Sequence, residues 1–218
     1  AINGGEFNVS IGNSSLDALT SGDSNTAIGY NSASGLTTGS ANTFLGENAG
    51  SNGVVTGNDN VVVGKSSGAN MTSANSNVFV GKDAGGENTT GQKHVLIGYQ
   101  AGKATTTNTD GFVAIGHSAG LATTSGGSIF IGNDAGKVNT TGSANISIGY
   151  QAYDNADTET NNLAIGTNAI GAAVNGGEYN VAIGNGTLDA LTSGDNNTAI
   201  GYHAGGSMTD GGNATLIG

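Results

Sequence analysis

The sequence predicts an all-β fold, a parallel β-solenoid or β-roll of about 13 coils with a repeat of about 17 residues, built as a fibre. Three observations predict it: an aliphatic–Gly pair that recurs along the whole chain, a β-branched residue two places before the aliphatic one, and a shortage of large side chains. The chain has 41 Gly but only five Phe and six Tyr, and it lacks Pro, Cys and Trp. Such a chain has too few large side chains to fill the core of an ordinary globular domain, so we expect a fold with a narrow interior.

The repeat is marked by the Gly that follows each aliphatic residue. The spacing between successive marker glycines is nearly constant and slips by only one place in a few copies. This regularity argues against disorder, which the low aromatic content would otherwise favour. We therefore expect one repeat-array domain over residues 1–218. The marker glycines are Gly12, Gly29, Gly46, Gly64, Gly81, Gly98, Gly116, Gly132, Gly149, Gly166, Gly184, Gly201 and Gly218.

Each copy of the repeat predicts one short strand that ends just before its Gly. In the first copy, Val9 and Ile11 lie two places apart, so they share one face of the strand. A unit of this length with a single strand is too short for a helical pair or a propeller blade. It suits one coil of a solenoid, and we expect the aliphatic column to fill the narrow interior.

Two polar columns follow the same period. An Asn ladder at the coil corner is expected four places before the marker Gly, because stacked Asn side chains bond one another and tolerate left-handed turns. Its members are Asn8, Asn25, Asn42, Asn60, Asn77, Asn145, Asn162, Asn180 and Asn197. A Thr column nine places before the Gly contains Thr20, Thr37, Thr72, Thr89, Thr107, Thr123, Thr140, Thr192 and Thr209.

The residue two places before each Gly is expected to point away from the interior, because its two aliphatic neighbours are taken to point inward. Several members of this column are large and apolar, and a soluble rod cannot leave them in water. Either a second packed sheet covers them or neighbouring chains pack on them, and we favour the second. The candidate inter-chain packing residues are Phe44, Val62, Phe79, Leu96, Phe130 and Leu216.

The repeat resembles two families of surface proteins. The core Asn-x-Ala-Ile-Gly-x-x-Ala, from Asn25 to Ser32, Asn162 to Ala169 and Asn197 to Ala204, resembles the head repeats of YadA-type trimeric autotransporter adhesins. The longer phrase T-T-G-x-x-N-T-A-I-G-Y-x-A resembles repeat arrays of phage and bacterial tail-fibre proteins. The resemblance covers the whole chain and implies a parallel β-roll, a homotrimer and a role in surface attachment. Adhesin heads commonly have shorter coils, so the coil shape is expected to differ.

A longer period relates the two ends of the sequence. Residues 1–30 match residues 173–202 at 24 of 30 positions, and the same super-repeat relates 1–46 to 173–218. The sequence stops inside the motif with no capping element, and an open solenoid end is an exposed strand edge. We expect either an excerpt of a longer array or a subunit that stacks head to tail in a filament.

Little in the sequence points to chemistry. His94, His117 and His203 occupy unrelated places in the repeat, and we expect exposed turn residues there. Ca²⁺ is the one cofactor that the sequence suggests, through acidic or Asn-rich turns. We expect these turns to be Asx turns and not Ca²⁺ sites. They are Ser21 to Asp23, Ser193 to Asp195 and Asn58 to Asn60. Glycan sequons begin at Asn70, Asn88, Asn139 and Asn213, as the composition alone would produce. No catalytic, metal-binding or cofactor-binding residue is predicted, and we expect no enzyme.

Charge and hydropathy exclude two classes of binding partner, nucleic acids and the membrane interior. Five Lys, no Arg and a net charge of −11 exclude the basic patch that a nucleic-acid binder needs. No apolar run approaches a membrane span, so no membrane insertion is expected. The leading hypothesis is a structural fibre or tail-fibre shaft, extracellular or on a virion, that assembles with itself as a homotrimer or head-to-tail filament. An adhesin module for a host receptor or glycan is the alternative, and ice binding through the interrupted Thr column is a minor one.

Overall fold

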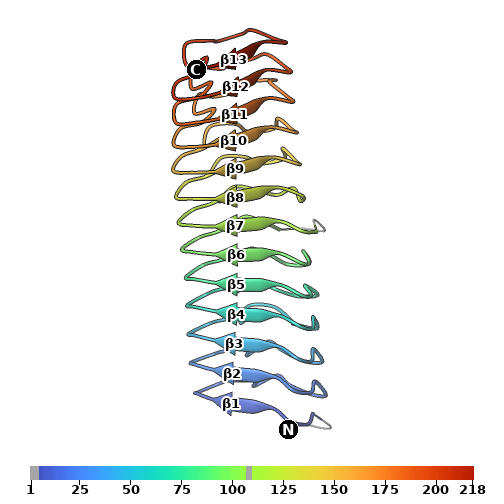
Figure 1. Cartoon of the computed structure of the whole chain (residues 1–218). Helices are drawn as coiled ribbons and strands as arrows, with labels where there is room; N and C mark the ends of the chain where they lie inside the picture. The colour runs from blue at the N-terminus through green and yellow to red at the C-terminus, as the bar shows by residue number, and fades with distance from the viewer. Residues whose placement is uncertain (1–4, 107–109) are drawn as a thin grey trace. The chain divides into compact units, whose positions relative to one another are not determined.

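The chain folds as a parallel β-solenoid, which confirms the fold class predicted by the repeat (Figure 1). The computed structural model describes residues 5–106 and 110–218. This part of the chain contains thirteen three-residue strands, one before each marker Gly, and no helix. The strands are β1 (Val9–Ile11), β2 (Thr26–Ile28), β3 (Thr43–Leu45), β4 (Val61–Val63), β5 (Val78–Val80), β6 (Val95–Ile97), β7 (Val113–Ile115), β8 (Ile129–Ile131), β9 (Ile146–Ile148), β10 (Leu163–Ile165), β11 (Val181–Ile183), β12 (Thr198–Ile200) and β13 (Thr215–Ile217).

The coils are described as two compact units, and the single repeat-array domain stays a prediction. Unit 1 comprises residues 1–111 with β1–β6, and unit 2 comprises residues 112–218 with β7–β13. Within each unit, every strand pairs in parallel with the next strand along the chain. In unit 1, for example, Val62 lies opposite Phe79. Equivalent residues of successive coils are therefore stacked directly on one another.

Backbone pairing between coils continues beyond the strands. At the start of β4, the Val61 amide donates to the Asn77 carbonyl at 2.8 Å. Elsewhere in the same coil, the amides of Gly68 and Thr72 donate to Ala84 and Thr89 at 2.9 and 2.8 Å. Because so many amides donate to the next coil, a Pro would remove a donor almost anywhere, which accounts for its absence from the chain.

The middle residue of each strand points into the coil, so the orientation expected for this column is wrong. The side chains of Phe44, Val62, Phe79, Leu96 and Phe130 have no exposed surface, and Leu216, in the last strand, is half-buried. These residues form the core and do not provide a surface for neighbouring chains. The period of two holds, but its phase is reversed, because the middle residue shares a face with the Asn two places before it.

The narrow interior is filled by pairs of residues six places apart. Where the middle strand residue is large, the residue six later is Gly, and a side chain there would overlap the ring of Phe44, Phe79 or Phe130. In three other coils the middle residue is small, and the residue six later is large and buried. The first kind of pair is Phe44 with Gly50, Phe79 with Gly85 and Phe130 with Gly136. The second kind is Ser147 with Tyr153, Ala164 with Ile170 and Ala182 with Leu188.

The Asn residues four places before the marker Gly form a hydrogen-bonded stack in each unit. In unit 1, the Asn60 side-chain amide donates to Asn42 Oδ1 at 2.9 Å, and Asn60 Oδ1 accepts from the Asn77 side chain at 3.0 Å. All members except Asn8 are buried. The left-handed backbone lies one residue earlier, as at Asp59 with φ of 60°. Asn is therefore selected for its two-sided hydrogen bonding, and the left-handed tolerance expected of it is not used here.

The ladder predicts that Asn60→Ala lowers the free energy of unfolding by about 2–4 kcal/mol, because buried partners in both neighbouring coils lose their hydrogen bonds. Urea unfolding followed by circular dichroism measures the change. The matched control is Asn52→Ala, an exposed Asn with a single Asn–Asn bond of 3.2 Å to Asn70, which we expect to change stability by under about 0.5 kcal/mol. Equal losses for the two variants would contradict the ladder's role.

The marker glycines predict a second contrast, between Gly132→Ala and Gly127→Ala in unit 2. Gly132 has φ of 141°, and a Cβ there would overlap the carbonyl of Gly149 in the next coil. We expect a loss of about 3 kcal/mol or more, or failure to fold. Gly127 is left-handed with nothing within 4 Å of its Cβ position, so its variant should lose only about 1 kcal/mol. Thermal unfolding of both variants tests the difference, and similar midpoints would refute the close stacking.

Candidate functional site

The outward side of the sheet is apolar. The first and last residues of the strands point outward in both units, and all are Val, Ile or Leu except Thr26, Thr43, Thr198 and Thr215. We call these residues the aliphatic face of each unit. Away from the terminal coils, their exposure reaches 39% at Val61 in unit 1 and 40% at Ile200 in unit 2. The repeat predicts that this column fills the interior, so the core and the surface are exchanged relative to that expectation.

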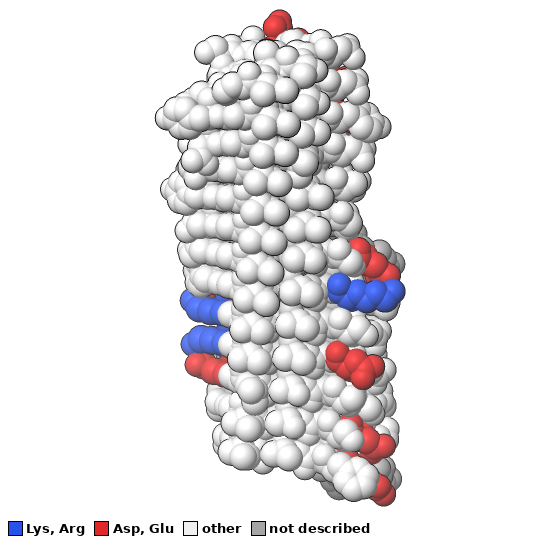
Figure 2. Space-filling view, in the orientation of Figure 1, with Lys and Arg blue, Asp and Glu red and all other residues white. Residues whose placement is uncertain are grey.

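In unit 1, charged side chains flank both edges of the aliphatic face. At the carboxyl ends of the strands, Lys65 pairs with Glu47 at 2.9 Å. At the amino ends, Lys93 pairs with Asp110 at 3.4 Å. Figure 2 shows charges along both edges of this face and none on its middle. The aliphatic face of unit 1 is therefore a continuous apolar strip with a polar rim.

The residue that follows each marker Gly forms a second outward column, which we call the corner column. In unit 1 it includes Glu47, Lys65 and Lys82, and the Lys82 ammonium lies 5.5 Å from the Tyr99 ring centre. In unit 2 it contains no Lys, Asp or Glu. Its members there are His117, Asn133, Tyr150, Thr167, Asn185 and Tyr202, all exposed.

The three histidines lie in separate environments, and one differs from the expectation. His94 occupies the ladder position of its coil and has no exposed surface, so the expected exposed turn is wrong for it. Burial lowers its pKa to about 4, and the charge of Asp110 opposes this shift only in part. His117 Nδ1 lies 4.0 Å from Asp134 Oδ1. The rings of His203 and Tyr202 pack edge to face, with their centroids 4.3 Å apart.

The acidic turns are used within the fold. Asp23 Oδ1 accepts the Glu6 amide at 2.8 Å, and Asp195 Oδ1 accepts the Glu178 amide at 2.9 Å, so each carboxylate joins two coils. Asn60, in the third turn considered for Ca²⁺, has its side chain in the ladder. In residues 5–106 and 110–218, no group of three or more His, Asp or Glu is placed to hold a metal ion.

One buried carboxylate was not anticipated. Glu159 in unit 2 is almost completely buried, and its carboxylate accepts the amides of Asp157, Thr158 and Gly176 at 3.0–3.1 Å. Gly176 belongs to the following coil, so this carboxylate also ties successive coils together. The sequence gives no signal for Glu159, because a Glu at this place in the repeat does not recur in other coils.

The Thr column joins coils through its hydroxyl groups. Thr20 and Thr192 donate to the carbonyls of Thr37 and Thr209, each at 2.9 Å, and Thr89 donates to Thr106. Thr123 is buried, and Thr124 takes its place in the column by donating to Thr140. Thr107 lies outside the described residues. Since these hydroxyl protons bond within the solenoid, the column is first of all a structural ladder.

Two of the four sequons lie inside the coils. Asn88 and Asn139 have no exposed surface, so the folded chain cannot present either to a glycosylating enzyme. Asn70 is half-buried and Asn213 is exposed. Some sequons in a chain this rich in Asn and Thr are therefore buried in the folded structure.

Comparison with known proteins leaves the family open. No family model matches the chain, and neither a curated protein nor a solved structure matches it. The resemblance to adhesin heads and tail-fibre arrays therefore stays a prediction. In the described part of the chain, no helix has the length and apolar character needed to span a membrane.

The burial of His94 predicts a pH dependence of stability. Its pKa falls from about 6.5 in the unfolded chain to about 4 when folded, so the unfolded state binds the proton more readily. The free energy of unfolding should be highest above pH 6.5 and should fall by about 3 kcal/mol towards pH 4. His94→Asn restores the ladder residue and should remove this part of the loss. Urea midpoints at pH 7 and 4.5 test this, and equal losses for both proteins would refute it.

Proposed function

We propose that this chain is a structural fibre module that assembles with copies of itself through the aliphatic face. The assembled form would be an extracellular or virion-borne shaft, such as a tail-fibre segment. The outward row of Val, Ile and Leu, which is at least partly exposed on every coil, is the observation that carries this proposal. Soluble monomers rarely expose a continuous apolar patch of this kind, and such patches mark interaction surfaces.

The geometry of the face suits association with a second copy. Its strands have three residues each and stack in regular parallel register, so the surface repeats coil by coil. Most of its side chains are β-branched, and such side chains lose little rotamer freedom when they become buried. Each further coil adds the same two outward residues, so the contact between copies grows with the length of the array. A long fibre could be held together in this way without any individually strong contact.

The two assembled forms considered differ in their solution mass. A homotrimer, which the adhesin resemblance implies, would weigh about 63 kDa, three times the chain mass of 21.1 kDa. A head-to-tail filament, the other form considered, would give long particles without a single mass. Both forms supply reach and rigidity, and in both the paired backbone protects the chain against proteolysis.

The proposal predicts that Val61→Glu/Val95→Glu dissociates the multimer to a 21.1 kDa monomer, because charges on the aliphatic face cannot be buried unpaired. The two positions lie on β4 and β6 with one strand between them, so the new charges do not stack on each other. Light scattering after size exclusion gives the mass, and circular dichroism reports whether the β-structure persists.

The matched control is Val54→Glu/Val138→Glu. Val54 and Val138 are also exposed, at 65% and 38%, but neither belongs to a strand. The control adds the same charge and should keep the mass of the unmodified protein. A multimer that survives both double substitutions, or an unmodified chain that is already a monomer, would contradict assembly through the aliphatic face.

A further inference from the structure

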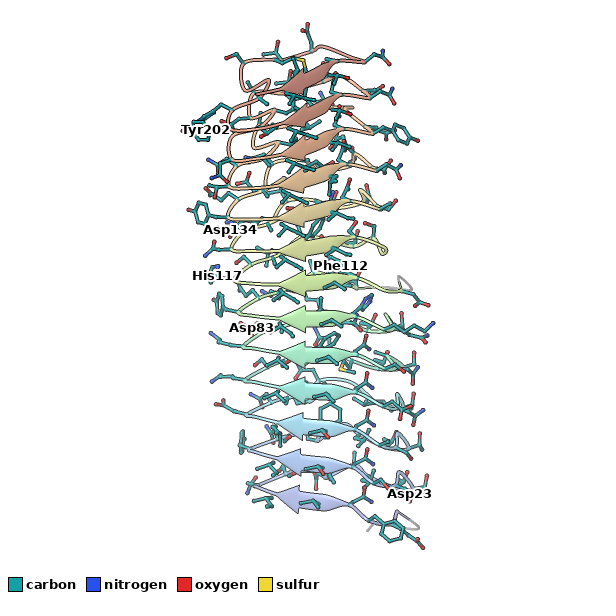
Figure 3. The ribbon with its side chains drawn as sticks, in the orientation of Figure 1. Asp23, Asp83, Phe112, His117, Asp134 and Tyr202 are labelled. Carbon is teal, nitrogen blue, oxygen red and sulfur yellow. The ribbon has the colours of Figure 1, made fainter. Side chains whose placement is uncertain are left out.

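The corner column of unit 2 is an uncharged outward row that carries two exposed tyrosines. Tyr150 and Tyr202 are 51% and 75% exposed, with Thr167 and Asn185 between them on the same column. Figure 3 shows Tyr202 and His117 both projecting beyond the carboxyl ends of the strands. Because the intervening coils are stacked about 4.8 Å apart, the two tyrosines are separated by about 14 Å along the column.

The backbone holds this column in a fixed register. The amide after each corner residue donates across coils: Gln151 to the Asn133 carbonyl, Asn168 to Tyr150 and His203 to Asn185, all at 2.9–3.0 Å. The Asn185 side chain also accepts the Thr167 amide at 2.9 Å. Binding a ligand along the column would therefore require little ordering of the backbone.

The side chains offer a particular chemistry. The phenol groups of Tyr150 and Tyr202, the Thr167 hydroxyl and the Asn133 side-chain amide make no hydrogen bond within the described residues, so they can meet an external ligand. Tyrosine combines a flat apolar ring with a polar tip, and this combination suits the mixed apolar and hydroxylated faces of a sugar ring. The column contains no Lys, Asp or Glu, and the chain carries a net charge of −11, which repels acidic polymers.

We propose that the corner column of unit 2 binds a linear, neutral polysaccharide that lies along the solenoid axis. The two exposed tyrosines would stack on sugar rings, while Thr167, Asn185 and Asn133 would face hydroxyl groups of the chain between and beside them. The corner column of unit 1 is a poorer site, because it carries Glu47, Lys65 and Lys82, and Lys82 already lies over the Tyr99 ring. This proposal does not depend on self-association.

Affinity electrophoresis of the full chain in native gels tests the proposal. The gels would contain dextran, a mannan, a xyloglucan or hydroxyethyl cellulose as neutral probes, and alginate as the acidic probe. We expect at least one neutral polysaccharide to retard the protein and alginate to have no effect. Tyr150→Ser/Tyr202→Ser should weaken the apparent affinity by about tenfold or more, since aromatic anchors dominate such contacts. Both side chains are exposed, so we expect the thermal midpoint to stay unchanged.

The matched control is Tyr179→Ser. Tyr179 in unit 2 has a similar exposure of 55% but lies five places before its marker Gly, outside the corner column. Its variant should bind like the unmodified protein. The proposal is overturned if no neutral polysaccharide retards the protein, if alginate alone does, or if the double variant binds unchanged. It is also overturned if the double variant loses the multimer mass together with binding, because the tyrosines would then belong to the contact between copies.

Discussion

The rest of the structure depends on one constraint, the in-register stacking of each coil on the next. Parallel pairing brings successive backbones to about 4.8 Å, so each residue lies directly over its equivalent one repeat away. At Gly132 this approach leaves no room for a Cβ beside the carbonyl of Gly149. At Asn60 the same approach lets one amide bond both neighbouring coils. The columns of identical residues in the sequence are the consequence of this stacking.

Stacking also converts a single residue choice into a property of a whole face. An Ile or Val before the marker Gly, repeated on nearly every coil, becomes the aliphatic face, and such a face is a surface suited to copies of the same chain. The residue just after the Gly is less uniform. It forms ion pairs in unit 1 and an uncharged row with Tyr150 and Tyr202 in unit 2. The repeat can therefore keep one face constant, as the proposed assembly requires, while another face varies, as the proposed polysaccharide binding requires.

Much of the fold could be predicted from the sequence, and the main error has a physical explanation. The strand positions and the Asn stack follow from the period of the repeat. The inner and outer faces are the reverse of the expectation, because two aliphatic residues on one face of a strand normally indicate the core. The exchange of size between residues six places apart, as in Phe44 with Gly50 and Ala164 with Ile170, marks the true interior. His94 could have been placed inside, since it stands four places before its marker Gly. The replacement of Thr123 by Thr124 in the Thr column could not be predicted, because the coil length varies at that point.

The claim that copies meet on the aliphatic face is tested most directly by a spin label placed on it. The chain has no Cys, so Val80→Cys provides a single attachment site at the end of β5. Double electron–electron resonance on the labelled protein should show dipolar coupling between labels on different copies, together with a strongly immobilised nitroxide. A mobile label without intermolecular coupling, at concentrations where the chain is multimeric, would show that the copies meet elsewhere and would contradict this account.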